Sequence, residues 1–214
     1  MKRGNTVDMN REYIEKRNEI LDAAEILFTA KGYEKCSVNN ILEKVGIAKG
    51  TFYYYFKSKE EVLDSIIDRV TQMVFKRVEA IAEDKNLSSK EKLIKAILSM
   101  RVESDRDNDF MTRIHKPENA LTHQKSLRLM LVTITPILDK IVEEGISRGS
   151  FKSDFPKQYL QIFLTSTMTL LDDGIFKTSP QEQQKIIRAL VSLLEKMLGV
   201  RDREFWDMVE VYYS

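Results

Sequence analysis

The chain has 214 residues, of which 43% are hydrophobic and 31% charged, and its formal net charge is +1. This length can bury a core without disulfides, and the near-neutral charge excludes a polycation that binds nucleic acid by bulk charge alone. One cysteine, Cys36, excludes an internal disulfide, and residues 1–8 lack the apolar stretch of a signal peptide, so we expect a cytoplasmic protein. The longest uncharged stretch, residues 158–171, is too short and polar to span a bilayer, so we expect no membrane segment.

The spacing of apolar residues predicts an all-α protein. Glycine and proline are scarce, with 8 and 4 residues, and apolar side chains recur every three or four positions, which is the period of a helix face. Pro136 falls inside one of the expected helices and predicts a kink there. The helices are expected at about residues 10–31, 37–45, 49–56, 60–86, 88–103, 119–148, 154–173, 179–198 and 203–212.

Three short helices are expected to begin within the stretch that follows Gly32. Gly32 can end the first helix, Ser37 can cap the next one, and Gly46 interrupts that helix after Val45. Residues 58–61, Ser-Lys-Glu-Glu, have the pattern of a capping box that opens a longer helix. Two short helices that meet at a steep angle through a glycine are typical of a helix-turn-helix unit that binds DNA.

The side chains around Gly46 divide into an inward and an outward set. The turn needs a residue that accepts positive φ, which glycine does without a steric penalty. The residues with the spacing to lock the two helices together are Ile41, Val45, Ile47, Phe52 and Phe56. The residues left on the outside of the second helix, and able to reach phosphates or base edges, are Lys49, Gly50, Thr51, Tyr53, Tyr54 and Tyr55.

Two of these predictions have a purely structural alternative. Tyrosines on short helices often pack as half-buried residues, but a helix of two turns cannot bury three consecutive positions, so at least one of Tyr53 to Tyr55 should face outward. Lys59 can be an ordinary solvated lysine, or it can join the amino end of its helix in holding a phosphate. The first 59 residues contain eleven basic and eight acidic side chains, which supports DNA binding only weakly.

The segments 31–33, 37–41 and 45–60 together resemble the TetR family of regulators. The resemblance covers about residues 14–65, and it implies a dimer that binds a palindromic operator and releases it when a small molecule binds the second domain. Two positions depart from the family's pattern. Ala48 stands where the family usually has a serine, and Leu42 stands where a small residue is usual at the tight helix crossing. By the same resemblance, Lys49, Gly50, Tyr53 and Tyr54 would face the major groove, and Ser37, Thr51, Tyr55 and Lys59 would hold phosphates.

Sequence patterns that suggest other chemistry have simpler explanations. Residues 145–149 match the Gly-x-Ser-x-Gly elbow of hydrolases, but no strand precedes them and no histidine follows. Residues 105–109 resemble the start of a calcium loop, but Phe110 replaces its glycine. His115 and His123 straddle Pro117, so one helix does not fix their spacing for a metal. We therefore expect no catalytic residues, no metal and no cofactor.

The carboxy-terminal helices predict a dimer interface and a ligand pocket. Residues 159–171 and 186–198 carry wide apolar faces that a second subunit could cover, so we expect a homodimer held by residues 156–198. Methionines suggest the pocket, because their flexible side chains adapt to ligands of different apolar shape. Filling of the protein core explains these methionines equally well. The candidate residues of the effector pocket are Met100, Phe110, Met111, His115, His123 and Met130.

These patterns favour a dimeric transcriptional regulator, and a repressor is favoured over an activator. We expect a DNA-binding domain at residues 1–58, a connecting helix at 59–84, and an effector-binding and dimerisation domain at 85–214. The expected partners are double-stranded DNA, a second copy of the chain and a small-molecule effector. The alternative is a helical protein-interaction adaptor that keeps the motif only as a scaffold. Salt-dependent binding to DNA separates the two hypotheses.

Overall fold

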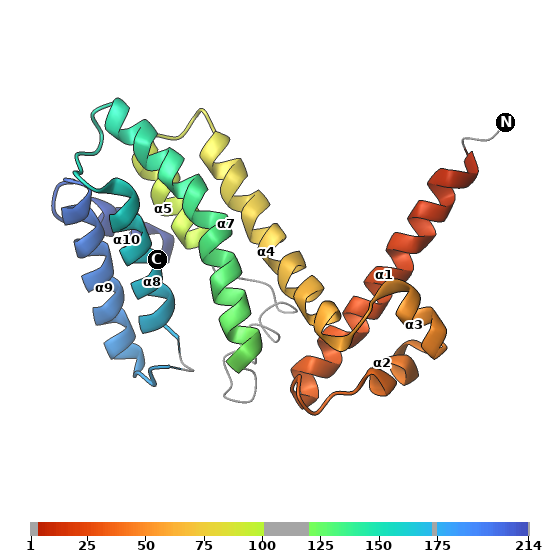
Figure 1. Ribbon diagram of the computed structural model, residues 1–214. Coiled ribbons are helices and arrows are strands. Elements are labelled where there is room, and N and C mark those ends of the chain that lie inside the picture. The colour runs from red at the N-terminus through yellow and green to blue at the C-terminus, as the bar shows by residue number, and fades with distance from the viewer. Residues whose placement is uncertain (1–3, 101–119, 173–174, 214) are drawn as a thin grey trace. The chain divides into compact units, whose positions relative to one another are not determined.

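The computed structural model describes residues 4–100, 120–172 and 175–213 (Figure 1). Within these ranges every regular element is a helix, which confirms the prediction of an all-α protein. The helices are α1 Gly4–Lys31, α2 Val38–Val45, α3 Lys49–Tyr55, α4 Lys59–Glu83, α5 Ser89–Ser99, α7 Ala120–Ser147, α8 Pro156–Leu170, α9 Pro180–Met197 and α10 Glu204–Tyr213.

Helix starts that follow a capping residue agree with the sequence. Ser88 and Glu91 form both hydrogen bonds of a capping box at the start of α5, and Ser179 accepts the backbone N–H of Glu182 at the start of α9. The prediction was wrong for the start of α1, which begins at Gly4 rather than near residue 10. It was also wrong for the end of α5, which comes at Ser99 rather than near residue 103.

The described residues form two compact units. The first consists of residues 4–70 with the first residues of α7, as far as Lys125. The second begins at Thr71, continues to the end of α5, and resumes at Ser126. Helices α4 and α7 therefore contribute residues to both units. The division into residues 1–58, 59–84 and 85–214 follows expected roles rather than contacts, and it stays a prediction.

The first unit is held together by the apolar face of α1. Ile20 and Leu21 are buried and pack in the same core as Ile41 of α2 and Phe52 of α3. This is the face that the three- and four-residue spacing predicts. Arg69 of α4 adds hydrogen bonds to two acidic residues of α1, 2.6 Å to Asp22 and a second to Glu25, which fix α4 against α1.

The second unit has a larger core to which α4, α5, α7, α8, α9 and α10 contribute. Helices α8 and α9 lie side by side, and α10 contacts both α9 and α5. Pro136 lies inside α7 as expected, and it removes one helical hydrogen bond because proline has no N–H. The hydroxyl of the preceding Thr135 donates to the carbonyl of Leu131 at 2.6 Å.

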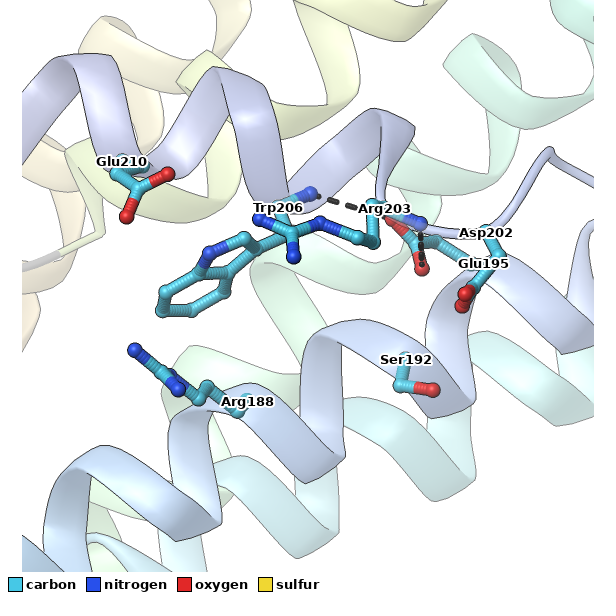
Figure 2. Close-up of a pocket in the computed structure, with 7 residues that line it drawn as sticks. All are labelled: Arg188, Ser192, Glu195, Asp202, Arg203, Trp206 and Glu210. Atoms are coloured by element: carbon cyan, nitrogen blue, oxygen red, sulfur yellow. Dashed lines mark hydrogen bonds between the residues drawn. The ribbon is translucent and has the colours of Figure 1, made fainter.

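A buried carboxylate fixes α10 in this unit. The Glu195 side chain of α9 accepts the backbone N–H groups of Arg203, Phe205 and Trp206 at 3.1, 2.7 and 3.2 Å, as Figure 2 shows for Arg203 and Trp206. It therefore pairs N–H groups at the start of α10 that no turn of that helix can pair. Phe205 and Val209 of α10 are buried in the core of this unit.

Candidate nucleic-acid interface

The turn between α2 and α3 has the backbone conformation predicted for Gly46. Gly46 has φ +72°, and its N–H donates to the carbonyl of Leu42 at 2.8 Å. The N–H of Ile47 donates to the same carbonyl at 3.1 Å. These two bonds end α2 and direct the chain into α3, in a conformation that favours glycine over residues with a Cβ atom.

The start of α2 depends on Ser37 and on a partner that the sequence pattern did not reveal. The Ser37 hydroxyl accepts the N–H of Asn40 at 3.3 Å, and the Asn40 side chain accepts the N–H of Ser37 at 2.9 Å. This is a capping box with asparagine where glutamate or glutamine is usual. Ser37 is exposed, so a phosphate role stays a prediction beside this structural one.

Helix α3 separates buried from exposed side chains as its two-turn length requires. Phe52 and the following Phe56 are buried, whereas Tyr53 is 47% and Tyr54 71% exposed. Lys49 and Gly50 are exposed too, while Thr51 and Tyr55 are half-buried. The expectation that at least one tyrosine faces outward is confirmed. Ala48 provides no side-chain cap for the helix, as its methyl group implied.

Gly50 is placed where the fold itself does not need glycine. It lies in the first turn of α3, and a Cβ atom added there would meet no other atom within 4 Å. A side chain at position 50 would therefore project into open space beside Lys49 and Tyr54. An exposed helical glycine with room for a larger residue fits a surface that another backbone approaches closely.

Lys59 has a structural role that its sequence context did not reveal. Its Nζ donates to the backbone carbonyls of Tyr33 and Cys36 at 2.8 and 2.9 Å, and it lies 4.0 Å from the centre of the Tyr33 ring. The ammonium thus joins α4 to the loop that precedes α2. Burial raises the pKa of the neighbouring Cys36 thiol, which disfavours its thiolate form.

The first turns of α4 differ from the predicted capping box. The N–H of Glu61 donates to the Ser58 hydroxyl at 3.1 Å, as expected, but the Glu61 carboxylate accepts the N–H of Lys57 at 2.6 Å. Lys125 of α7 donates to Glu60 and Asp64 at 2.7 and 2.8 Å. These hydrogen bonds raise the pKa of Lys125, and the one to Glu60 lowers the pKa of that carboxyl.

The predicted effector residues are distributed over both units. Met130 is buried in the core of the second unit, and Met100 is half-buried against that core, which favours the alternative of core filling. His123 belongs to the first unit. Phe110, Met111 and His115 lie outside the described residues.

A cavity of about 260 Å³ opens between α9 and α10, and the three described candidates, Met100, His123 and Met130, do not line it. Its walls include Arg188, which lies under the ring of Trp206 with its guanidinium carbon 5.0 Å from the ring centre (Figure 2). Among the described residues no cluster of three His, Cys, Asp or Glu side chains could hold a metal ion. In the same ranges, every helix is too short or too polar to cross a lipid bilayer.

Helices α8 and α9 use only part of their apolar surface within one chain. Leu190 and Leu194 are 6% and 1% exposed, so they belong to the core of the subunit. Ile162 of α8 and Leu193 of α9 are instead 50% and 37% exposed. The predicted apolar faces therefore include an inner part that folds the chain and an outer part that remains open.

A glycine-mediated turn, a buried α2–α3 contact and an exposed polar and aromatic face on α3 define a helix-turn-helix DNA-binding protein. The family model "Bacterial regulatory proteins, tetR family" matches residues 20–66, and the model "Tetracyclin repressor-like, C-terminal domain" matches residues 101–192. The chain belongs to the TetR family of transcriptional regulators. Members of this family bind DNA and are not enzymes.

Relatives along most of the chain agree with this assignment. The fatty acid metabolism regulator protein of Bacillus subtilis (strain 168) is 30% identical over 139 residues, which cover 64% of this chain and 71% of that protein. The structure of SmeT, the repressor of the Stenotrophomonas maltophilia multidrug efflux pump SmeDEF, is 20% identical and covers 87% of this chain and 91% of its own, with a TM-score of 0.61. RolR in complex with resorcinol is 15% identical with a TM-score of 0.60, covering 92% and 93%. The two structures show likeness of fold.

Proposed function

We propose that this regulator is a repressor that binds a palindromic operator as a homodimer and leaves it when a small molecule binds. As a DNA-binding regulator it would act in the cytoplasm, where bacterial DNA lies. The observation that supports the proposal most strongly is the exposed face of α3. That face carries Lys49, Tyr53 and Tyr54 around a glycine that the fold does not require.

The exposed residues of α3 suit the major groove. Lysine can donate to guanine, tyrosine can contact base edges and thymine methyls, and Gly50 lets the backbone come close. We assign Lys49, Gly50, Tyr53 and Tyr54 to the groove on this basis. Phosphates would be held by Ser37, Thr51, Tyr55 and Lys59. Lys59 would keep its two carbonyl bonds while its positive charge attracts a phosphate.

A second copy of the chain would cover the outer apolar part of α8 and α9. Ile186, Leu193 and Met197 are spaced by seven and four residues, so they form one stripe along α9, beside the buried Leu190 and Leu194. Each of the three keeps part of its side chain exposed in the single chain. Isologous packing of such faces in a dimer places two copies of α3 on one DNA duplex, and two-fold symmetry in the protein requires a palindromic site.

The effector is proposed to be a small apolar or amphipathic molecule that binds within residues 90–176. Met100, which follows α5, is half-buried and can supply adaptable apolar surface, and the related structure of RolR holds resorcinol. Coupling of about 1–3 kcal/mol would suffice for a 5- to 150-fold change in operator affinity. It would pass along α4, whose first turns Lys125 of α7 holds by two hydrogen bonds.

Selection of bound duplexes from a randomised DNA pool by the purified full-length chain tests this proposal. We expect enrichment of an inverted repeat whose half-sites are centred about 10 base pairs apart or a multiple of that spacing. Added small aromatic or acyl compounds should then release the selected duplex. Failure to enrich any sequence would contradict DNA recognition and favour a protein-interaction adaptor, and enrichment of an unrepeated half-site would contradict the dimer.

A further inference from the structure

Tyr13 of α1 contacts the tyrosines of α3 from outside the helix-turn-helix unit. The centre of its ring lies 4.9 Å from that of Tyr55, at an interplanar angle of 35°. It lies 5.8 Å from that of Tyr54, with the two planes at 78°. Tyr54 and Tyr55 are themselves 5.0 Å apart at 88°. These distances and angles are those of favourable offset and edge-to-face aromatic pairs.

The position of Tyr13 on α1 explains why it reaches α3. Tyr13, Arg17 and Ile20 follow one another at intervals of four and three residues, so they share one face of α1. Ile20 is buried in the core, and the Arg17 guanidinium lies 4.9 Å from the centre of the Phe56 ring and donates to the Ser65 hydroxyl at 2.9 Å. The face of α1 thus extends from the core, along the carboxyl end of α3, to the exposed tyrosines.

We propose that Tyr13 is a specificity-determining residue, which acts by holding Tyr54, directly and through Tyr55, in the orientation that reads the operator. The inference rests on the proposed function, since it requires that α3 reads DNA. It goes beyond the helix-turn-helix motif, because the family model begins at residue 20, seven positions after Tyr13.

The physical reason is the high exposure of Tyr54. Tyr54 is 71% exposed, so few other protein atoms surround its side chain. The contacts that restrict the rotation of its ring are those with the rings of Tyr13 and Tyr55. A side chain that is free in the unbound protein loses rotamer freedom when it contacts a base, and this loss weakens binding. Tyr13 removes part of that loss before DNA arrives. The effect on Tyr54 applies to base contacts in the preferred operator, so it changes specificity.

Tyr13→Leu in the full-length protein separates this role from simple packing. Leucine keeps an apolar side chain and a high helix propensity but removes the aromatic contacts. We expect affinity for the selected operator to fall by about two- to tenfold, the range that the loss of an aromatic pair produces, while affinity for random duplex falls less and the salt dependence stays constant. Tyr13→Phe keeps the ring and should restore the ratio of operator to random affinity.

A matched control distinguishes specificity from stability. Ile20→Val trims the buried core of α1 without touching the tyrosines, so it should lower the melting temperature and leave the affinity ratio unchanged. In the free protein, NMR of labelled tyrosine should show that the ring signals of Tyr54, assigned with Tyr54→Phe, shift in Tyr13→Leu. The same signals should stay in place in Ile20→Val.

The outcomes separate this inference from the proposed function. A wild-type protein that binds operator and random duplex equally would contradict the proposed function. A wild-type protein that prefers its operator, with the same preference in folded Tyr13→Leu, would contradict the role of Tyr13 alone. A loss in Tyr13→Phe as large as in Tyr13→Leu would also overturn it, because the hydroxyl rather than the ring would then carry the effect.

Discussion

At the scale of single residues, Lys59 combines a bond to the fold with a position beside the proposed DNA surface. Its ammonium satisfies the carbonyls of Tyr33 and Cys36 in the loop before α2. Such a lysine cannot be read as a phosphate contact alone. The effect of a Lys59 variant on folding must be measured before any loss of DNA affinity is assigned to a lost phosphate contact.

Lys59→Met should therefore destabilise the protein even without DNA. The apolar side chain has a similar length but leaves two carbonyls without their donor, which costs about 1–3 kcal/mol for partly buried groups. Thermal unfolding followed by circular dichroism measures this loss. Lys57→Met, at an exposed neighbouring position, is the control and should change stability little. Equal melting temperatures for both variants would show that the Lys59 hydrogen bonds do not stabilise the fold.

Gly50 and Gly46 offer a second contrast between folding and binding. Gly50→Leu adds a good helix former in open space, so the free protein should be as stable as wild type or slightly more stable. Operator binding should be lost, because the new side chain blocks close approach of α3. Gly46→Ala should instead destabilise the fold by about 1–2 kcal/mol, since its φ is +72°. Calorimetry and a binding assay on both variants check this, and operator binding by Gly50→Leu at wild-type strength would refute the close approach.

At the scale of helices, Glu195 connects α9 with the start of α10. Glu195→Ala should cost about 1–3 kcal/mol, because the N–H groups of Phe205 and Trp206 lose their acceptor while they stay mostly buried. Trp206 is the one tryptophan of the chain, so its fluorescence reports directly on α10. We expect the emission to shift to longer wavelength at lower denaturant concentration than in wild type. Glu182→Ala, on the exposed first turn of α9, should not shift the Trp206 transition.

The difference between buried and exposed residues of α8 and α9 predicts which substitutions should break the proposed dimer. Ile162→Glu combined with Leu193→Glu should convert the proposed dimer to a folded monomer, because both residues are exposed in the single chain. Leu194→Glu should instead unfold the second unit, since it places a charge in the core. Light scattering and circular dichroism distinguish the two results, with Gln184→Glu as a surface control. A folded dimer of the double variant would place the interface elsewhere.

The same helices show which parts of the structure were predictable from sequence. Helix starts at Ser88 and Ser179 were predictable, because a hydroxyl three residues before an acidic residue is a local signal. The inner and outer parts of the α9 apolar face were not, because Leu190 and Leu193 differ only in what packs against them. The carboxylate of Glu195 and the ammonium of Lys59 could not be assigned either, since their partners lie 8 to 11 and 23 to 26 residues away.

At the scale of the whole molecule, the fold, the turn at Gly46 and the family followed from sequence. The fold follows from apolar residues that recur every three or four positions, and the family follows from the motif in segments 31–33, 37–41 and 45–60. The effector site did not follow, since the same methionines serve a core or a pocket, and Met130 lies in the core. Tyr13 was missed because the contact of its ring with α3 depends on the packing of helices far apart in sequence.

The central claim is that the exposed face of α3 reads bases, and the binding of Tyr54→Ala tests it most directly. Operator and random duplex should be titrated with wild type and variant over a range of salt concentrations. We predict a loss of about 1–3 kcal/mol on the operator, a much smaller loss on random duplex, and a nearly constant salt slope, because a base contact is removed and no phosphate contact is. Unchanged operator affinity, or an equal loss on both duplexes with a shallower salt slope, would contradict the claim.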